Sequence, residues 1–160
     1  MRDALALLRQ LAAAKRLSLR PSDAVAALLL DEEGRYILQL RDAKNEIFFP
    51  GHWGCFGGGV EQGEEPEVAI RRELHEELGF ELKQAKRFTR LEFDFAPLGH
   101  GRTYRIYYEI VVPSSELRRF VLGEGAEFGA HTVADVLSKE RVVPYDAFAI
   151  WLHAFSARRA

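Results

Sequence analysis

The sequence has few cysteines, no large excess of charge of one sign and no long apolar run, which is typical of an ordinary globular protein. Cys55 is its single cysteine, which excludes an intrachain disulfide and fits a reducing, cytoplasmic compartment. Its 22 Lys and Arg residues stand against 24 Asp and Glu residues, and the formal net charge of −2 leaves no broad basic field for generic binding to nucleic-acid backbones. No apolar run approaches the length of a membrane span, so no membrane partner is expected.

The chain does have enough apolar material for one core. With 160 residues and 48% hydrophobic side chains, it has the size of a single domain. Leu5 and Leu8 begin a helically spaced leucine pattern, and Pro21 follows it. The sequence therefore predicts an N-terminal helix over residues 1–20 and a main domain over residues 21–160. We expect this helix to pack on the domain or on a second subunit, which would make the protein a homodimer.

Three carboxylates crowd one face of a second predicted helix. Glu73, Glu76 and Glu77 are spaced three and four residues apart, so they share a face near the helix C-terminus. Like charges destabilise a helix at those spacings, and the helix macrodipole also disfavours anions at that end. A solvated surface helix rich in glutamate would show the same charge pattern. A bound divalent metal ion would instead offset both costs with a charge that the chain itself lacks.

The helix that carries these carboxylates has clear ends and one apolar side. Pro66 suits the first helical position, because its missing N–H would have no partner there. Gly79 is predicted to end the helix as a left-handed residue. Between them, Ile70, Leu74 and Leu78 form a stripe that would face a core. One side therefore anchors the helix while the neighbouring side collects negative charge.

The whole run around this helix resembles the signature of the Nudix hydrolases at every defined position. The signature spans 23 residues here and reads Gly58, five residues, Glu64, seven residues, Arg72-Glu73-Leu74, one residue, Glu76-Glu77, one residue, Gly79-Phe80. The resemblance implies a loop–helix–loop that binds Mg²⁺, or Mn²⁺ in its place, and an enzyme that hydrolyses a pyrophosphate bond. It is confined to these residues and to the strands expected around them.

The resemblance also implies roles for individual residues. The three carboxylates of the helix match the metal ligands of the family, and oxygen ligands suit a hard cation such as Mg²⁺. The backbone carbonyl of Gly57 is expected to join them. Arg72 and Glu64 match a pair that forms an orienting ion pair within the motif, and both are counted with the catalytic residues.

Two places in the chain can supply the catalytic base. Some family members use the residue that matches Glu73, whereas others use a glutamate from a later loop, as base or as a further metal ligand. The acidic stretch 124–127 offers such a glutamate. We choose Glu127 for this role, with Glu124 as the alternative. A solvated acidic loop would have the same composition.

Hydrophobic alternation around the motif indicates an α/β protein. Strands are expected at residues 23–30, 35–41, 53–56, 87–95 and 103–112, with a closing helix over residues 145–155. Periodicity alone gives only an α/β fold with antiparallel hairpins. The family resemblance sharpens this to a Nudix-type α/β/α sandwich with a mixed β-sheet, plus the extra N-terminal helix.

The function implied by the resemblance is Mg²⁺-dependent cleavage of a pyrophosphate bond in a nucleoside diphosphate linked to another group. The residues expected to contact this small-molecule substrate are Arg41, Trp53, Phe56 and Tyr104, although strand aromatics are also common in cores. Two alternatives stay open. A non-catalytic Nudix-like sensor would bind a ligand without needing the full set of carboxylates. An isoprenoid diphosphate isomerase would need a cysteine, for which Cys55 is the single candidate.

Overall fold

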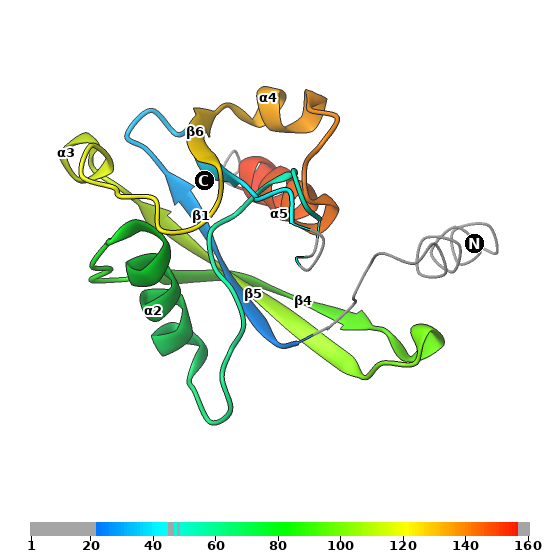
Figure 1. Ribbon diagram of the computed structural model, residues 1–160. Helices are drawn as coiled ribbons and strands as arrows, with labels where there is room; N and C mark the ends of the chain where they lie inside the picture. Colours follow the sequence, from blue (N-terminus) through cyan, green and yellow to red (C-terminus); the bar gives the residue numbers. More distant parts are fainter. Residues whose placement is uncertain (1–21, 45–46, 48, 157–160) are drawn as a thin grey trace.

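The computed structural model describes residues 22–44, 47 and 49–156. These residues form a six-stranded sheet and several helices. The strands are β1 (Ala24–Leu30), β2 (Tyr36–Leu40), β3 (Trp53–Gly54), β4 (Lys86–Asp94), β5 (Arg102–Val111) and β6 (Glu127–His131). The helices are α2 (Pro66–Leu78), α3 (Ser114–Leu117), α4 (Val133–Ser138) and α5 (Pro144–Ser156), with the short 3₁₀ helix η1 (Ala96–Leu98) (Figure 1). None of the described helices combines the length and the apolar character that a membrane crossing requires.

The helix predicted for residues 1–20 lies outside the described residues. Its packing on the domain and its role in a homodimer therefore stay predictions.

The sheet is mixed because β1 pairs in opposite senses with its two neighbours. Strand β1 runs parallel to β5 along its whole length and antiparallel to β2. The main path through the sheet is β3-β2-β1-β5-β4, and β6 pairs with β2 outside this path. Beyond β3, the chain continues beside β1 through bridges at Phe56 and Gly59, which carries the glycine segment to the central strand. The predicted mixed sheet is confirmed.

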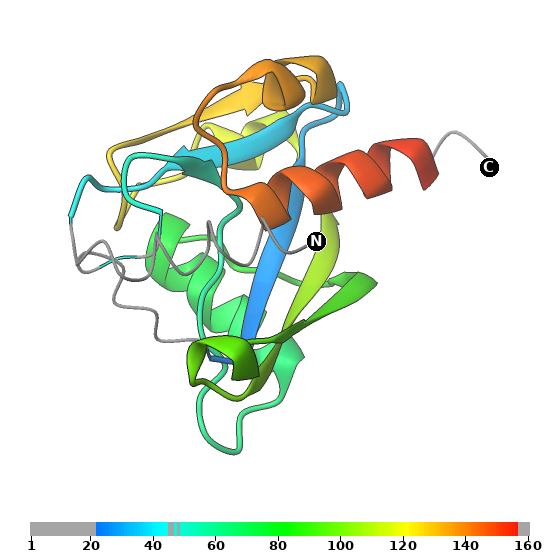
Figure 2. The same cartoon turned by 90° about the vertical axis from the view of Figure 1, so that its right-hand side faces the viewer.

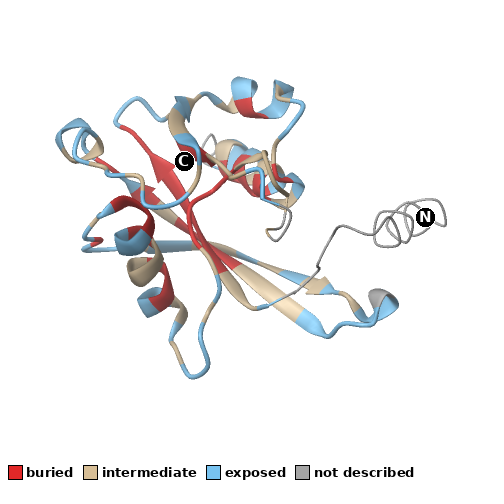
Figure 3. Cartoon of the chain, viewed as in Figure 1, coloured by how far each residue is buried: buried red, intermediate tan, exposed pale blue. Residues whose placement is uncertain are grey.

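Helices cover both faces of the sheet because the side chains of β1 alternate between two cores. Val25 and Leu29 belong to one core, which includes the apolar stripe of α2. Ala26 and Leu28 belong to a second core, which includes residues of α5. Burial is concentrated along the central strands and the helix sides that face them (Figure 3), and α5 crosses in front of β1 in Figure 2. This α/β/α sandwich is the one predicted from the sequence.

Helix α2 begins and ends where the sequence indicates. Pro66 is its first residue, where a missing N–H is tolerated. Gly79 follows the last residue with a left-handed φ of 63°, and its N–H donates to the carbonyl oxygen of His75 at 2.8 Å. The N–H of Phe80 donates to the carbonyl oxygen of Leu74 at 3.2 Å, which closes the turn. The apolar stripe is fully buried, so the helix is fixed against the sheet with its carboxylates beside the glycine segment.

Because Leu74 is fully buried between α2 and the sheet, truncating it should be costly. We expect Leu74→Ala to lower the free energy of unfolding by about 2–5 kcal/mol, through lost burial and a residual cavity. Val68 lies on the same helix but is 52% exposed, so Val68→Ala should change stability by less than about 0.5 kcal/mol. Urea unfolding followed by circular dichroism measures both variants, and equal losses would contradict the assigned burial.

Candidate active site

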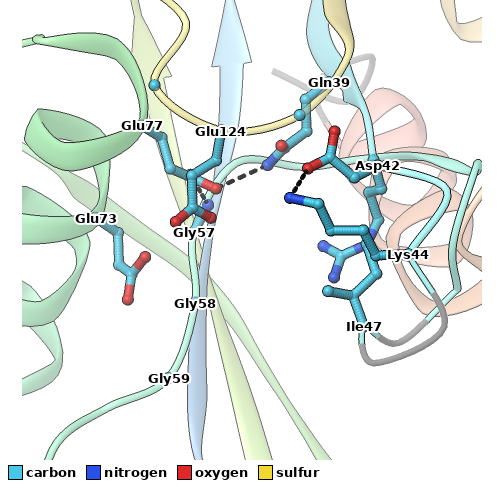
Figure 4. A pocket seen from close by; sticks show the side chains of 13 residues that line it. Gln39, Asp42, Lys44, Ile47, Gly57, Gly58, Gly59, Glu73, Glu77 and Glu124 are labelled. Atoms are coloured by element: carbon cyan, nitrogen blue, oxygen red, sulfur yellow. Dashed lines mark hydrogen bonds and ion pairs between the residues drawn. The ribbon is translucent and has the colours of Figure 1, made fainter.

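A cavity of about 650 Å³ opens where α2, the glycine segment and the loop before β6 meet the end of β2. In Figure 4 the carboxylates of Glu73, Glu77 and Glu124 occupy one side of this cavity, and Asp42 and Lys44 occupy the other. Its lining residues are Gln39, Arg41, Asp42, Lys44, Ile47, Gly57, Gly58, Gly59, Glu73, Glu77, Gly123, Glu124 and Gly125. The three glutamates are called the acidic wall below.

The glycine segment lets the backbone pass closely between β1 and the acidic wall. Gly57 has a φ of 123°, and a Cβ atom there would collide with the carbonyl oxygen of Val25. A Cβ atom on Gly58 would lie 2.5 Å from Oε1 of Glu73. A larger residue at either position would therefore displace the central strand or a carboxylate of the cavity.

Glu77 is a buried carboxylate with both oxygens held. Its Oε2 accepts from the backbone N–H of Gly57 at 2.7 Å, and its Oε1 accepts from Nε2 of Gln39 at 2.9 Å. The residue is 6% exposed. Its pKa is raised to about 7, first because burial disfavours the charged form and then because Glu73 and Glu124 repel it, while the two hydrogen bonds limit the rise. Glu77 is therefore the most strongly constrained member of the acidic wall.

Glu73 shares one arginine nitrogen with Glu76. Nη1 of Arg72 donates to Oε1 of Glu73 at 2.9 Å and to Oε2 of Glu76 at 3.2 Å. The pKa of Glu73 is raised, first by burial and then by the charges of Glu76 and Glu124, while Arg72 opposes the rise. The two carboxylates are thus close enough to share one cationic group. The side chain of Glu76 is 59% exposed, and this residue does not line the cavity.

Arg72 is fixed by a two-point ion pair with Glu64. Its Nε and Nη2 donate to the two oxygens of Glu64 at 2.9 and 3.0 Å, and Nη2 also donates to the carbonyl oxygen of Gly59 at 3.0 Å. The hydrogen bonds from Arg72 hold the pKa of Glu64 below its usual range. The predicted Arg72–Glu64 ion pair is present, and it ties the start of the motif to α2.

The loop before β6 brings Glu124 into the cavity. Gly123 donates its N–H to the carbonyl oxygen of Glu77 at 2.8 Å, so the loop caps the C-terminal end of α2. A Cβ atom on Gly123 would lie 2.5 Å from the carbonyl oxygen of Glu76. Glu127, the glutamate preferred from the sequence, is the exposed first residue of β6 and is not among the lining residues. The fold thus brings Glu124, the alternative, to the acidic wall.

Of the four residues predicted to contact substrate, Arg41 lines the cavity and the three aromatic residues do not. Phe56 is 0% exposed, so packing in the core replaces the predicted substrate contact. Tyr104 lies under the guanidinium of Arg90, whose carbon is 4.2 Å from the ring centroid. Trp53 packs against the second core. Contact of Trp53 and Tyr104 with a substrate stays a prediction.

Three polar lining residues are missing from the sequence prediction, namely Gln39, Asp42 and Lys44. Gln39 is a buried amide in the strand Tyr-Ile-Leu-Gln-Leu, and a lone amide in such a run is the signal that could have found it. Nζ of Lys44 lies 2.8 Å from Oδ2 of Asp42, just beyond β2. That stretch has ordinary loop composition, so the sequence carries no signal for it.

Known proteins share both the motif and this arrangement of strands. The family model for the NUDIX domain matches residues 20–152. The chain belongs to the Nudix family. Among its relatives, the nucleoside triphosphatase NudI of Salmonella arizonae is 50% identical over 54 residues, which make up 34% of this chain and 38% of NudI. The match therefore spans little more than a third of that relative's length.

Solved structures superpose on most of this Nudix chain. The MutT protein of Methanosarcina mazei Go1 gives a TM-score of 0.71 at 22% identity, covering 88% of this chain and 99% of that one. The NUDIX domain of Shewanella oneidensis NrtR, solved with ADP ribose, gives 0.64 at 16% identity and covers 94% and 97%. Likeness at such identities shows a shared fold, and it confirms the predicted Nudix-type sandwich.

The Nudix motif implies a divalent metal, and the carboxylate oxygens of the acidic wall are the donors that a hard cation prefers. Within residues 22–44, 47 and 49–156, no three Asp, Glu, His or Cys side chains lie close enough together to hold a metal ion by themselves. The predicted trio is divided, because Glu73 and Glu77 line the cavity while Glu76 pairs with Arg72 beside it. Two cavity carboxylates leave most coordination positions of a metal ion to water and substrate. Mg²⁺ commonly binds in this way, so these residues fit Mg²⁺ better than a metal that takes all its ligands from protein.

The buried carboxylate of Glu77 should make the metal-free protein sensitive to pH. Its pKa is raised from 4.5 to about 7 in the folded protein, so the stabilisation from its protonated form is present at low pH and is lost as the pH rises through about 7. In the presence of a chelator, we expect the wild type to lose up to about 3 kcal/mol of stability relative to Glu77→Gln between about pH 5 and about pH 8.

Urea unfolding at several pH values measures this difference. Glu81→Gln is the control, because the side chain of Glu81 is 84% exposed and its replacement leaves the buried carboxylate in place. Its pH profile should follow the wild type. If the profile of Glu77→Gln also ran parallel to the wild type, Glu77 would titrate at its ordinary value.

Proposed function

We propose that this Nudix protein is a Mg²⁺-dependent hydrolase that cleaves a pyrophosphate bond in a nucleoside diphosphate linked to another group. The observation that carries the proposal is that the acidic wall lines the same cavity as Arg41 and Lys44. Carboxylates suit a hard metal ion, and cationic side chains suit phosphate oxygens. The partial match to a NudI nucleoside triphosphatase makes nucleoside triphosphates the first substrates to test.

In this proposal Glu73 and Glu77 hold the metal, with Glu76 beside them. Nη1 of Arg72 lies between the carboxylates of Glu73 and Glu76, which supports their sharing one cation. Gly57 lines the cavity, and its backbone carbonyl stays a proposed ligand. When bound, Mg²⁺ or Mn²⁺ would lower the pKa of a water and neutralise charge on phosphoryl oxygens.

Glu124 is our choice for the base that accepts the proton of the attacking water. It lines the cavity, and its charge acts on both Glu73 and Glu77. Those two carboxylates already accept hydrogen bonds from α2 and from the glycine segment, which leaves the loop glutamate best placed for proton transfer. Glu73 is the second candidate because it also lines the cavity, and Glu127 ranks below both.

Arg41 and Lys44 would bind the phosphate oxygens of the substrate. The backbone of Arg41 is fixed, because its N–H donates to the carbonyl oxygen of His52 at 2.9 Å. Lys44 pairs with Asp42, so an anionic substrate would compete with that carboxylate for the ammonium group. The two cations would therefore place a diphosphate against the acidic wall.

The two alternative functions have less support. A sensor has no need of a metal-activated water, yet the chain keeps every carboxylate of the motif. Isomerase chemistry would need an accessible thiol. Cys55 is 1% exposed, burial raises its pKa, and it does not line the cavity.

A panel of nucleoside triphosphates, nucleotide sugars and dinucleoside polyphosphates tests the proposal. We expect Mg²⁺-dependent hydrolysis of at least one of them, and Glu73→Gln should lower kcat/KM about a hundredfold or more because the metal loses a ligand. Glu81→Gln changes an exposed glutamate just beyond the same helix and should keep wild-type activity. If no substrate were turned over with Mg²⁺ or Mn²⁺, the sensor would become the better explanation.

The loop glutamates offer a matched pair of variants. Glu124→Gln should lower kcat by roughly 10²- to 10⁴-fold, because an amide cannot accept the proton. Glu127→Gln should retain activity, since Glu127 does not line the cavity. Steady-state kinetics on an active substrate measure both variants. The reverse ranking of the two variants would restore Glu127 as the base.

A further inference from the structure

Gln39 is a buried amide in an otherwise apolar strand. It is 3% exposed in β2, between Leu38 and Leu40. Removing an amide from water is unfavourable unless hydrogen bonds replace those to the solvent, so this side chain needs a partner. Ile37, two residues earlier on the same face of the strand, belongs to the core that includes α2. The chain therefore keeps an amide where an apolar side chain would extend that core.

The partner of Gln39 is the Glu77 carboxylate. Nε2 of Gln39 donates to Oε1 of Glu77 at 2.9 Å, while the N–H of Gly57 donates to Oε2 at 2.7 Å (Figure 4). The two donors come from separate parts of the fold, β2 and the glycine segment. Rotation of the carboxylate would break both hydrogen bonds, so together they impose one orientation.

The same amide lies against the loop that carries Glu124. A Cβ atom on Gly125 would lie 3.0 Å from Oε1 of Gln39 and 3.1 Å from the carbonyl oxygen of Leu40. Gly125 also has a φ of 89°, which favours glycine. The N–H of Ala126 donates to the carbonyl oxygen of Leu40 at 2.8 Å, which fixes the loop on β2. One side chain thus binds a carboxylate of α2 and leaves no room for a side chain at Gly125 of the loop.

We propose that Gln39 is a positioning residue that orients the Glu77 carboxylate and links it to the loop carrying Glu124. This inference rests on the metal site of the proposed function. Without the amide, Glu77 would be held by Gly57 alone, and the two parts of the acidic wall would lose a shared contact. Groups that orient metal ligands affect metal affinity directly, so the expected consequence is weaker metal binding and not only a weaker fold.

Binding of Mn²⁺ to the substrate-free protein, measured by titration calorimetry, tests this role without relying on turnover. Gln39→Leu keeps a similar side-chain volume but removes the donor, and its Kd for Mn²⁺ should rise by roughly 10- to 100-fold. Ile37→Val is the matched control, because Ile37 is equally buried on the same strand face. It should lower the melting temperature and leave the Kd unchanged. A folded Gln39→Leu variant with the wild-type Kd would overturn the proposal.

A double-mutant cycle tests the link to the loop. Gly125→Ala should also weaken Mn²⁺ binding, because the new methyl group would meet the Gln39 amide and the backbone of Leu40. If the loop acts through the amide, the effect of Gly125→Ala should shrink in the Gln39→Leu background, whereas fully additive effects would overturn the link. Should Gln39→Leu fail to fold, Gln39→Asn takes its place, since it keeps the amide on a side chain too short to hold Glu77.

Measuring turnover separately distinguishes a failure of the proposed hydrolase function from a failure of the proposed role of Gln39. With an active wild type, excess Mg²⁺ should restore most of kcat in Gln39→Leu, while the Mg²⁺ concentration for half-maximal rate rises. If the wild type binds Mn²⁺ but hydrolyses no substrate, the proposed function fails, and the Mn²⁺ Kd still decides the role of Gln39. A loss of kcat that excess Mg²⁺ does not restore, with an unchanged Kd, would overturn the positioning role.

Discussion

The burial of the Glu77 carboxylate is the constraint on which the rest of the cavity depends. Burial disfavours its charged form, and the repulsion from Glu73 and Glu124 adds to that cost. Hydrogen bonds from Gly57 and Gln39 partly offset this cost, and they fix both oxygens of the carboxylate. A divalent ion among these glutamates would relieve the repulsion that the hydrogen bonds only limit. Burying this carboxylate therefore costs stability, and the proposed binding of a divalent metal ion would offset that cost.

Glycine makes this concentration of charge geometrically feasible. The acidic wall is assembled from a helix and a loop that approach other backbone atoms more closely than a side chain would allow. Gly58 leaves room for the Glu73 carboxylate, and Gly123 leaves room for the last carbonyls of α2. Gly125 does the same for the Gln39 amide. A methyl group at any of these positions would come within about 3 Å of these atoms, so part of the surroundings of the cavity would have to shift.

The sequence prediction succeeded for features that depend on residues close together in the chain. Pro66 and Gly79 mark the ends of α2, and Arg72 and Glu64 meet because helix geometry and a short loop bring them together. Features that depend on strand pairing were harder to predict. Phe56 is an aromatic residue beside the motif, yet its position beside β1 turns it into the core. Sequence periodicity does not say which face of a strand meets a cavity, because that depends on the neighbouring strands.

Residues 58–80 were enough to predict the family and the bounds of the carboxylate helix. They also predicted the acidic character of the site, since spacing along one helix decides which side chains share a face. Tertiary structure was needed to show that Glu124 lines the cavity and Glu127 does not, because β6 begins at Glu127. It was needed again for Gln39, which lies 38 residues before Glu77 and meets it across the core. The lone amide in an apolar strand marks Gln39 as unusual, but only the packing of sheet against helix shows that Glu77 is its partner.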